Sequence, residues 1–209
     1  MFIVLSAPSG AGKTTIARAV MERFPALSFS VSATTRARRP AERDGIDYYF
    51  LTLDEFHART ERGEFVEWEE VFGNAYGTLH SELLRATRDG RHLLFDVDVK
   101  GALSIKRNFP RETVSIFIDP PGMDVLRERL ERRLTDSPEV IATRLARAAW
   151  EREQRPLFDH VVVNDDLPRA IDAVSALVAT ALGATQSGAT QPDATQPGDA
   201  TPTVQSITD

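Results

Sequence analysis

A glycine-rich turn that ends in a lysine and a threonine is the strongest chemical signal in the sequence. It runs from Ala7 to Thr14 as APSGAGKT, after an apolar run and before a helix-forming segment. Glycines at Gly10 and Gly12 let backbone N–H groups turn inward toward phosphate oxygens, and the helix N-terminus adds partial positive charge. Lys13 can then reach the β- and γ-phosphates of a nucleotide, and the Thr14 hydroxyl can ligate Mg²⁺. The residues predicted to contact a nucleoside triphosphate are Ala7, Pro8, Ser9, Gly10, Ala11, Gly12, Lys13, Thr14 and Thr15.

A carboxylate at the end of a later apolar run fits the same chemistry. The run LLFDVD ends in Asp96 and Asp98. Proteins that use such a phosphate loop keep a metal-side carboxylate of this kind. We therefore predict that Asp96 acts directly and, with Thr14, helps to hold Mg²⁺. Asp98 is equally suited to an ion pair with an arginine, so its role stays open.

Polar side chains between residues 32 and 78 could bind a second, phosphate-bearing substrate. Three arginines, among them Arg36 and Arg39, follow one another closely, and arginine makes forked, charge-assisted hydrogen bonds to phosphate oxygens. Glu67 can accept two adjacent donors, which guanine offers at N1–H and at its exocyclic N2 and adenine does not. The hydroxyls of Ser32 and Thr78 can donate to guanine O6. Such a site should reject adenine, because its buried polar groups would be left unpaired.

Composition limits the class of protein. The chain has 209 residues, no cysteine, and 31 acidic against 25 basic residues, for a formal net charge of −6. Without cysteine there is no disulfide framework, zinc–thiolate site or thiol catalysis, and bulk charge does not attract the chain to nucleic acid or to acidic membranes. No apolar run approaches the roughly 20 residues of a membrane helix, and the first residues lack a signal-peptide pattern. We expect a soluble cytoplasmic protein that binds neither nucleic acid nor membrane.

Strands that alternate with helices predict an α/β fold. The alternation implies right-handed crossovers and a parallel sheet with helices on both faces, and five strands are expected in it. The predicted strands cover Phe2–Ala7, Ser28–Ser32, His92–Val97, Thr113–Ile118 and His160–Val163, and the main predicted helices cover Lys13–Arg23, Val99–Asn108, Met123–Leu134, Pro138–Arg155 and Asp166–Leu182.

Two stretches depart from this alternation. Residues 36–90 hold a charged turn, an aromatic segment and a short helix that begins at Leu53 behind a Thr52/Glu55 capping box, and they predict a small mixed α/β insertion. Residues 183–209 repeat Ala-Thr-Gln three times and contain no Lys, Arg or aromatic residue, so they cannot offset the entropy of ordering. We expect one domain over residues 1–182, with a core of 1–35 and 91–182, and a disordered low-complexity tail over 183–209.

Several separate motifs, in order along the chain, resemble those of the guanylate kinase family, of the bacterial soluble type. The resemblance runs from about Phe2 to Leu182 and rests on SAPSGAGKTT, SATTRARRPAERDGIDYYF, GEFVEWEEVFGNAYGT, FDVDVKGA, RERLERRLTDSPEVIATRLARA and VVVNDDL. It implies a P-loop fold like that of nucleoside monophosphate kinases, with a GMP-binding insertion and a helical lid at about residues 127–150. It also implies Mg²⁺-dependent transfer of the γ-phosphoryl group of ATP to GMP, giving ADP and GDP.

The resemblance implies a role for individual residues as well. It maps Arg129, Arg133 and Arg144 to the lid. Arg133 and Arg144 would stabilise the transferred phosphoryl group together with Lys13, and Asn164 would lie near the adenine of ATP. The implied GMP contacts are Ser32, Arg36, Arg39, Tyr48, Glu67, Tyr76, Thr78 and Asp96.

The sequence departs from the family pattern at Lys100, where the family usually has glutamine, and at Leu134, where the lid commonly has glycine. Two other functions remain as alternatives. A non-catalytic binding module of this fold would typically have a degraded phosphate loop, and a related kinase with a sugar-phosphate acceptor should lack the full set of tyrosines and glutamate that reads the base. The choice between monomer and homodimer does not follow from the sequence.

Overall fold

The computed structural model describes residues 1–132 and 137–187, and within them the chain forms two β-sheets. The larger sheet is parallel and five-stranded, as predicted, with the strand order β2-β7-β1-β8-β9. Its strands are β1 (Phe2–Ser6), β2 (Leu27–Phe29), β7 (His92–Asp96), β8 (Thr113–Asp119) and β9 (His160–Val163).

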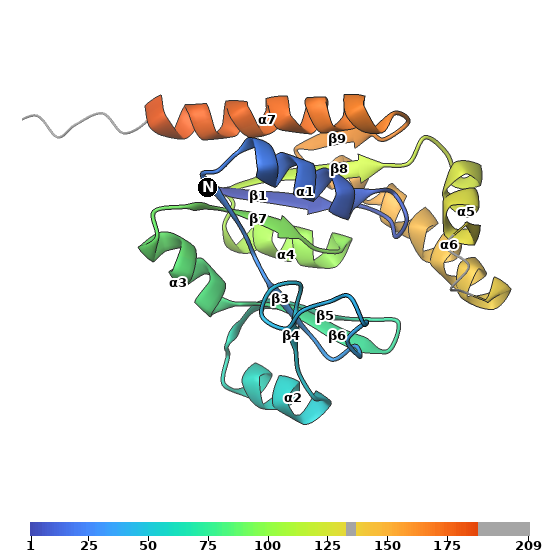
Figure 1. Cartoon of the computed structure of the whole chain (residues 1–209), viewed down its shortest axis with the longest axis horizontal. Helices are drawn as coiled ribbons and strands as arrows, with labels where there is room; N and C mark the ends of the chain where they lie inside the picture. Colours follow the sequence, from blue (N-terminus) through green and yellow to red (C-terminus); the bar gives the residue numbers. More distant parts are fainter. Residues whose placement is uncertain (133–136, 188–209) are drawn as a thin grey trace, which may run out of the picture.

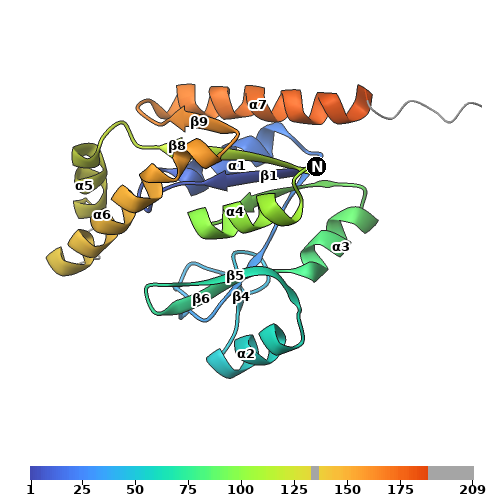
Figure 2. The same ribbon diagram turned by 180° about the vertical axis from the view of Figure 1, so that it is seen from behind.

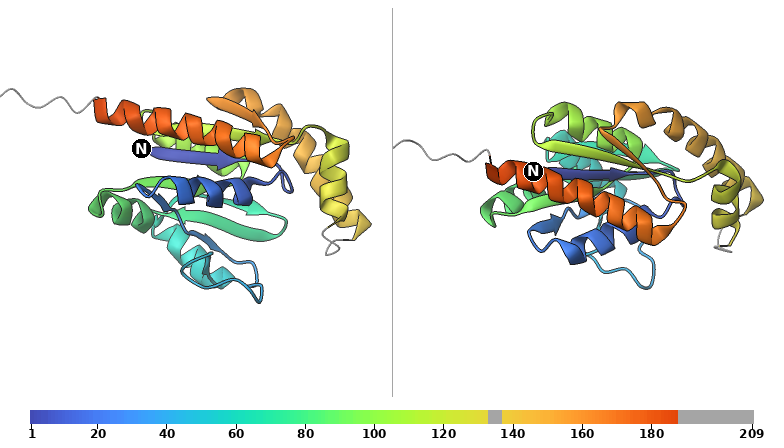
Figure 3. Two further views of the ribbon diagram at one scale, coloured as in Figure 1. Left: turned by 45° about the horizontal axis from the view of Figure 1, so that its top comes forward. Right: turned by 90° about the horizontal axis from the view of Figure 1, so that it is seen from above.

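Helices cover both faces of the larger sheet, as Figures 1 and 2 show from opposite sides. Two of them, α1 and α7, lie side by side on one face (Figure 3), and α3 and α4 cover the other. Successive residues of a strand point to opposite faces, so Ile3 and Leu5 pack with α1 and α7 whereas Val4 packs with α4. The four helices are α1 (Lys13–Arg23), α3 (His80–Arg88), α4 (Val99–Asn108) and α7 (Leu167–Ser187).

The second sheet is small and mixed, and lies below the larger sheet in Figure 1. Its strand order is β4-β3-β6-β5; β3 and β4 are parallel, and β6 pairs antiparallel with β3 and β5. Phe56 of α2 fills its core, and α2 begins with the predicted Thr52/Glu55 capping box. The elements of this small lobe are β3 (Ser32–Thr34), β4 (Tyr49–Phe50), α2 (Leu53–Glu61), β5 (Phe65–Val71) and β6 (Asn74–Leu79).

The predicted single strand over residues 28–32 is wrong. The chain forms β2 in the larger sheet, leaves it after Phe29, and enters the small sheet at Ser32. The Ser30 N–H still donates to Leu94 O (2.9 Å), but the Val31 N–H donates to Glu82 (2.8 Å). The small lobe therefore starts before residue 36, the predicted start of the insertion. The break was hidden because extended, alternating residues continue through it.

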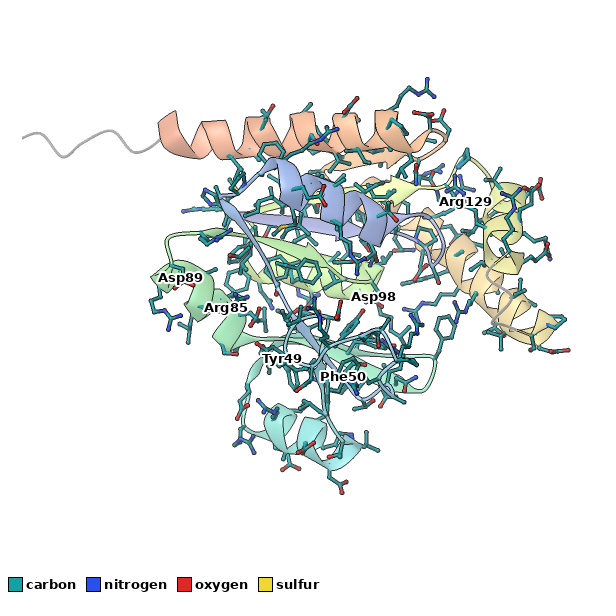
Figure 4. All side chains as sticks on the ribbon, in the orientation of Figure 1. Tyr49, Phe50, Arg85, Asp89, Asp98 and Arg129 are labelled. Carbon is teal, nitrogen blue, oxygen red and sulfur yellow. The ribbon has the colours of Figure 1, made fainter. Side chains whose placement is uncertain are left out.

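A buried carboxylate holds the junction between the two sheets. Glu82 of α3 is 1% exposed. Besides Val31, it accepts hydrogen bonds from the Tyr49 hydroxyl (3.0 Å) and from Arg85 Nη2 (2.7 Å). Arg85 also donates to Phe29 O at the end of β2 (3.0 Å), and Figure 4 labels Tyr49 and Arg85 where α3 meets the small lobe. Since the chain enters the small lobe at Val31 and leaves it through α3, this network ties together both crossings.

Two helices, α5 (Met123–Glu131) and α6 (Pro138–Glu153), form the region predicted to be a lid. They pack on each other through a small apolar core and project beyond the carboxyl end of the larger sheet (Figure 1). Asp119 at the end of β8 anchors the base of α6, because Arg152 donates two hydrogen bonds to it (2.7 and 3.2 Å). The predicted site residue Arg133 and the family departure Leu134 lie outside the described residues.

The last helix runs further than predicted. The expected helix ends at Leu182, whereas α7 continues to Ser187, so the predicted tail boundary falls inside a helix. Extending a helix that is already packed on the sheet adds one hydrogen bond for each residue that is ordered, which favours continuation beyond the packed part. Residues 188–209 lie outside the described part of the chain. Among the described residues, none of the helices has the length and apolar character needed to cross a membrane.

Candidate active site

One cavity of about 340 Å³ opens at the carboxyl ends of β1 and β7, between the larger sheet, the small lobe and α6. Its walls include the phosphate loop, the hairpin of β5 and β6, and residues of α6. The carboxyl ends of parallel strands are where open α/β sheets bind ligands. Members of both groups of residues predicted to bind substrates therefore face one cavity, although they come from different lobes.

The glycines of the phosphate loop are required by its backbone. Gly10 and Gly12 have φ values of 97° and 96°, which side chains other than glycine rarely adopt. A Cβ atom at Gly10 would lie 3.1 Å from side-chain atoms of Leu126 and Leu130, and one at Gly12 would collide with the Asn164 amide. Since α1 begins at Lys13, the loop ends at a helix N-terminus that favours anions.

Lys13, Thr14 and Asp96 contact one another at the floor of the cavity. Lys13 Nζ binds Asp96 Oδ1 (2.8 Å) and donates to the Val97 carbonyl (2.6 Å), which leaves one of its three donors. The Thr14 hydroxyl donates to Asp96 Oδ2 (2.9 Å). No cluster of three or more acidic or histidine side chains suited to a metal is found in residues 1–132 and 137–187. Mg²⁺ in kinases is held by one or two protein oxygens together with substrate phosphates, and the hydroxyl and carboxylate of this pair fit that donor set.

Asn164 lies behind the phosphate loop. It follows β9, is 4% exposed, and donates from Nδ2 to the Ala11 carbonyl (2.7 Å). Its own backbone is held on both sides. The Asn164 N–H donates to Asp119 O (2.8 Å), and the Asn164 carbonyl accepts from Arg129 Nη2 (2.9 Å). Figure 4 labels Arg129 on α5, on the lid side of the molecule. Asn164 therefore braces the loop, and its predicted contact with adenine stays a prediction.

The small sheet presents a row of polar residues on one face. In the strand pairing, Thr78 of β6 lies opposite both Ser32 of β3 and Glu67 of β5, and the Thr78 hydroxyl donates to Glu67 Oε1 (2.6 Å). Directly paired residues share a face of the sheet. Phe65 and Glu67 would share a face in a regular strand, but the β-bulge between them places Phe65 opposite Leu79 in the apolar core and Glu67 opposite Thr78 on the polar face. The tertiary structure thus brings together three of the predicted GMP-contacting residues.

Glu67 is the most perturbed carboxyl group in the cavity wall. It is 9% exposed. Burial, together with the carboxylates of Asp98 and Glu69 and against the hydrogen bonds from Thr78, raises the pKa of Glu67 to about 7. A Cβ atom at Gly101 would lie 2.8 Å from Glu67 Oε2, so the first turn of α4 closes over this carboxylate only because Gly101 has no side chain. The hydrophobic periodicity of the sequence gave no indication of this role of Gly101.

Lys100, which departs from the family pattern, links the two lobes. Its ammonium lies 2.5 Å from Glu69 Oε1 on β5, so an ion pair joins α4 to the small sheet. Lysine near a helix N-terminus is disfavoured by the helix dipole, and the Glu69 carboxylate offsets this. Lys100 is not part of the cavity wall, whereas Glu69 is.

The predicted phosphate-binding residues of the small lobe lie around two tyrosines. Tyr48 and Tyr76 both line the cavity with their rings 6.2 Å apart. Burial, with Asp96 adding to it, raises the pKa of Tyr48 to about 12, so its hydroxyl stays a donor. Arg39 lines the cavity, while the Arg36 guanidinium lies 5.4 Å from the Tyr48 ring centroid, behind the wall.

Glu42 is a site residue that the sequence analysis missed. It accepts hydrogen bonds from Arg36 Nη2 (2.7 Å) and from the Arg39 N–H (2.8 Å). Burial alone would raise the pKa of Glu42, but these hydrogen bonds lower it below its ordinary value. Glu42 thus orients both predicted phosphate-binding arginines. The only hint in the sequence was an acidic residue inside a basic turn, which is typical of solvated loops too.

Arg144 and two residues the sequence analysis missed line the cavity from α6. Arg144 Nη1 reaches Ser9 Oγ of the phosphate loop (3.4 Å). Arg147 donates to Asp98 Oδ2 (2.7 Å) and to Glu151 Oε1 (2.9 Å), so Asp98, labelled in Figure 4 and left open by the sequence, forms an ion pair with an arginine. Glu151 is 4% exposed, and burial raises its pKa while Arg147 opposes the shift. The helical spacing of 144, 147 and 151 was a usable signal, obscured by the many charges of this helix.

Comparisons with known proteins agree with this geometry. The family model for guanylate kinase matches residues 1–181. The chain is 50% identical to a guanylate kinase of Chlorobaculum tepidum over 177 residues, which cover 85% of this chain and 91% of that protein. It is 51% identical to a guanylate kinase of Salinibacter ruber over 81% of this chain and 90% of that protein.

A solved structure supports the fold as well. The guanylate kinase of Anaplasma phagocytophilum superposes with a TM-score of 0.72 at 34% identity, covering 86% of this chain and 85% of that one. The family match over residues 1–181 includes the phosphate loop, the small lobe and the lid helices together. This chain belongs to the guanylate kinase family.

Proposed function

We propose that the chain transfers the γ-phosphoryl group of ATP to GMP, with Mg²⁺, giving ADP and GDP. The observation that carries the proposal is the cavity that joins an intact phosphate loop to a buried Glu67 held by Thr78. The first feature suits a triphosphate, and the second suits a base with two adjacent N–H donors. The names of the relatives reported above support the same reaction.

The small lobe is expected to select guanine. Glu67 as a carboxylate accepts from guanine N1–H and N2–H, and the geometry of the Thr78 hydroxyl keeps Glu67 oriented for this. A hydroxyl has one proton, so Thr78 cannot donate to Glu67 and to guanine O6 together. Ser32, its neighbour on β3, is then the hydroxyl available for O6. Adenine has an amino group in place of O6 and no N1–H, so it would leave Glu67 unpaired.

The acceptor phosphate is expected to lie near Tyr48, Tyr76 and Arg39, at the side of the cavity that faces the phosphate loop. The Arg36 guanidinium, oriented by Glu42, adds positive charge behind Tyr48. The attacking oxygen is already an oxyanion, so no general base is required. Catalysis then consists of alignment and of stabilising the charge of the transferred group.

Lys13 and Arg144 are the residues expected to stabilise that charge. Lys13 has one donor left after its contacts with Asp96 and the Val97 carbonyl, and Arg144 already reaches the phosphate loop through Ser9. Thr14 and Asp96 would hold Mg²⁺, which supplies charge neutralisation between the β- and γ-phosphates. Arg133 is proposed for the same task from the family pattern alone. Closing the small lobe and α6 over the cavity would exclude water from the reacting groups.

The proposal includes a cytoplasmic location and applies to a monomer or a homodimer alike. The described residues of one chain supply both halves of the cavity. The absence of cysteine fits a reducing compartment. The alternatives of a binding module and a sugar-phosphate kinase are disfavoured because Lys13, Thr14 and Asp96 retain their contacts and the cavity keeps Tyr48, Tyr76 and Glu67.

The test is ADP production from MgATP with GMP, AMP, a ribose bisphosphate or no acceptor. We expect turnover that depends on GMP, with AMP much poorer. The variant Glu67→Gln should lower kcat/KM for GMP about 10²-fold, since two hydrogen bonds to a charged group are lost or weakened, and should leave KM for ATP nearly unchanged.

Glu70→Gln is the matched control. Glu70 lies on the same strand, is exposed, and loses the same charge, so its kinetics should match the wild type. Equal losses in the two variants would contradict a base-reading role for Glu67. Binding of GMP without turnover in the wild type would favour the binding module.

A further inference from the structure

Phe72, at the tip of the β5–β6 hairpin, contacts the lid helix α6. Its ring centroid lies 5.8 Å from Arg144 Cζ and 5.3 Å from Arg147 Cζ, within the range of about 6 Å for a cation–π interaction. The hairpin belongs to the small lobe, and in both Figure 1 and Figure 2 its turn is directed toward the region of α6. Phe72 therefore bridges two parts that the chain connects only by way of the larger sheet.

The backbone conformation at Phe72 is unfavourable for a residue with a bulky ring. Phe72 and Gly73 form a two-residue loop between the paired residues Val71 and Asn74, with φ values of 51° and 75°. Positive φ at both positions is the signature of a type I′ turn, in which asparagine is preferred first and a bulky residue is disfavoured. The ring is also 48% exposed. Neither the turn nor a core explains this aromatic residue, whereas its contact with two arginines does.

The contact with the ring does not itself occupy the hydrogen-bond donors of the two arginines. The face of an aromatic ring attracts a cation without accepting hydrogen bonds through lone pairs, so the N–H donors of a guanidinium remain for other groups. Arg144 extends one of them to Ser9 of the phosphate loop (3.4 Å), and Arg147 extends two, to Asp98 (2.7 Å) and to Glu151 (2.9 Å). The strands that flank Phe72 carry Glu67 and Tyr76, and all three residues line the cavity.

We propose that Phe72 is a positioning residue that couples the acceptor half of the cavity to the donor half. The proposal rests on the proposed function. GMP bound by Glu67 and Tyr76 fixes the hairpin, and Phe72 then holds Arg144 and Arg147 over the phosphate loop. Conversely, ATP phosphates that bind these arginines fix Phe72, and the hairpin is then held in the position that contacts GMP. Coupling of this kind is reciprocal, so each nucleotide raises the affinity for the other by the same factor.

The test compares three substitutions of one residue. Phe72→Leu keeps apolar bulk without the ring face, Phe72→Asn also relieves the positive φ, and Phe72→Tyr keeps the ring. Titration calorimetry measures the Kd of a non-hydrolysable MgATP analogue with and without GMP. GMP should lower the Kd of the analogue in the wild type and in Phe72→Tyr. In Phe72→Leu and Phe72→Asn the coupling factor should fall about fivefold, while the Kd of each nucleotide alone changes less than twofold.

A second readout needs neither substrate. Amide hydrogen exchange in α6, without nucleotide, should be faster in Phe72→Leu and Phe72→Asn than in the wild type and Phe72→Tyr. Faster exchange in Phe72→Asn would tie the effect to the ring, because the turn itself becomes more favourable in that variant.

Two results would overturn the proposal. One is a coupling factor in Phe72→Leu equal to that of the wild type, with GMP turnover, and hence the proposed function, intact. The other is a loss of GMP affinity in the absence of the analogue as large as the loss in its presence, because Phe72 would then act on the acceptor half alone. Failure of the wild type to phosphorylate GMP would refute the proposed function instead, and α6 exchange would still show whether the ring holds the lid.

Discussion

The donor and acceptor halves of the cavity bind phosphate by different means. The donor half is built around one contiguous segment, residues 7–15, whose backbone N–H groups and helix N-terminus attract anions. The acceptor half is assembled from side chains spread from Ser32 to Thr78, and each key group is held by another side chain. Thr78 orients Glu67 and Glu42 orients Arg36.

The difference teaches what each half tolerates. Recognition by backbone does not depend on the protonation of side chains, but it fails when a Cβ atom is added at Gly10 or Gly12, because both have positive φ and a Cβ atom at Gly12 would collide with Asn164. Recognition by paired side chains depends on protonation and on partners outside the cavity. We therefore expect variants of the donor half to act on ATP and on the chemical step, and variants of the acceptor half to act on GMP and to change with pH.

The largest expected effect comes from Lys13→Ala. The ammonium contacts Asp96 and is the group proposed to stabilise the transferred phosphoryl, so its loss should lower kcat about 10³-fold, as for removal of a main transition-state donor. KM for GMP should change little. ADP production measures the effect, and circular dichroism checks the fold. Wild-type turnover in this variant would contradict the assignment of the donor half.

The second-largest expected effect is a pH dependence of KM for GMP that KM for ATP does not share. With the pKa of Glu67 raised to about 7, its carboxyl group becomes protonated as pH falls through 7 and can no longer accept both guanine donors. KM for GMP should rise about tenfold per pH unit below 7, while KM for ATP stays nearly flat. Glu67→Gln should lack this step and retain only the titration of GMP itself. A parallel rise for both nucleotides would argue against Glu67 as its cause.

Glu42→Gln should weaken the binding of GMP without changing the binding of ATP. The substitution removes the charge that holds Arg36, and we expect KM for GMP to rise about tenfold, as for loss of one charge-assisted hydrogen bond. Glu61→Gln, an exposed position at the end of α2, serves as the control in the same lobe. Tighter GMP binding by Glu42→Gln would mean that Glu42 competes with phosphate for Arg36 instead of orienting it.

The smallest effect is expected for Asn164→Ala on the donor side. The Ala11 carbonyl loses its side-chain donor, which should lower the free energy of unfolding by about 1–2 kcal/mol and raise KM for ATP about fivefold. Thermal unfolding and steady-state kinetics measure these changes. An increase in KM for GMP of the same size would show that Asn164 does not act through the phosphate loop.

Much of the donor half was predictable because its signals are local. The phosphate loop, α1 directly behind it and the carboxylate at the end of β7 all follow from spacing within a few residues, and α1, α4 and β9 have the predicted bounds. The predicted capping box of α2 is local as well, and it is present. Local rules work here because a strand, a turn and a helix start each depend on neighbouring residues.

Contacts between distant segments decided the rest. The chain leaves β2 at Ser30 because Glu82, far along the sequence, binds Val31. Gly101 makes room for Glu67, Asn164 braces Ala11, and Phe72 reaches α6 only because the hairpin and the lid are folded toward each other. A side chain in one segment carries no pattern that names its partner in another. Residue types were therefore sufficient to indicate the chemistry, whereas the packing of the two lobes determined which groups meet and with what pKa.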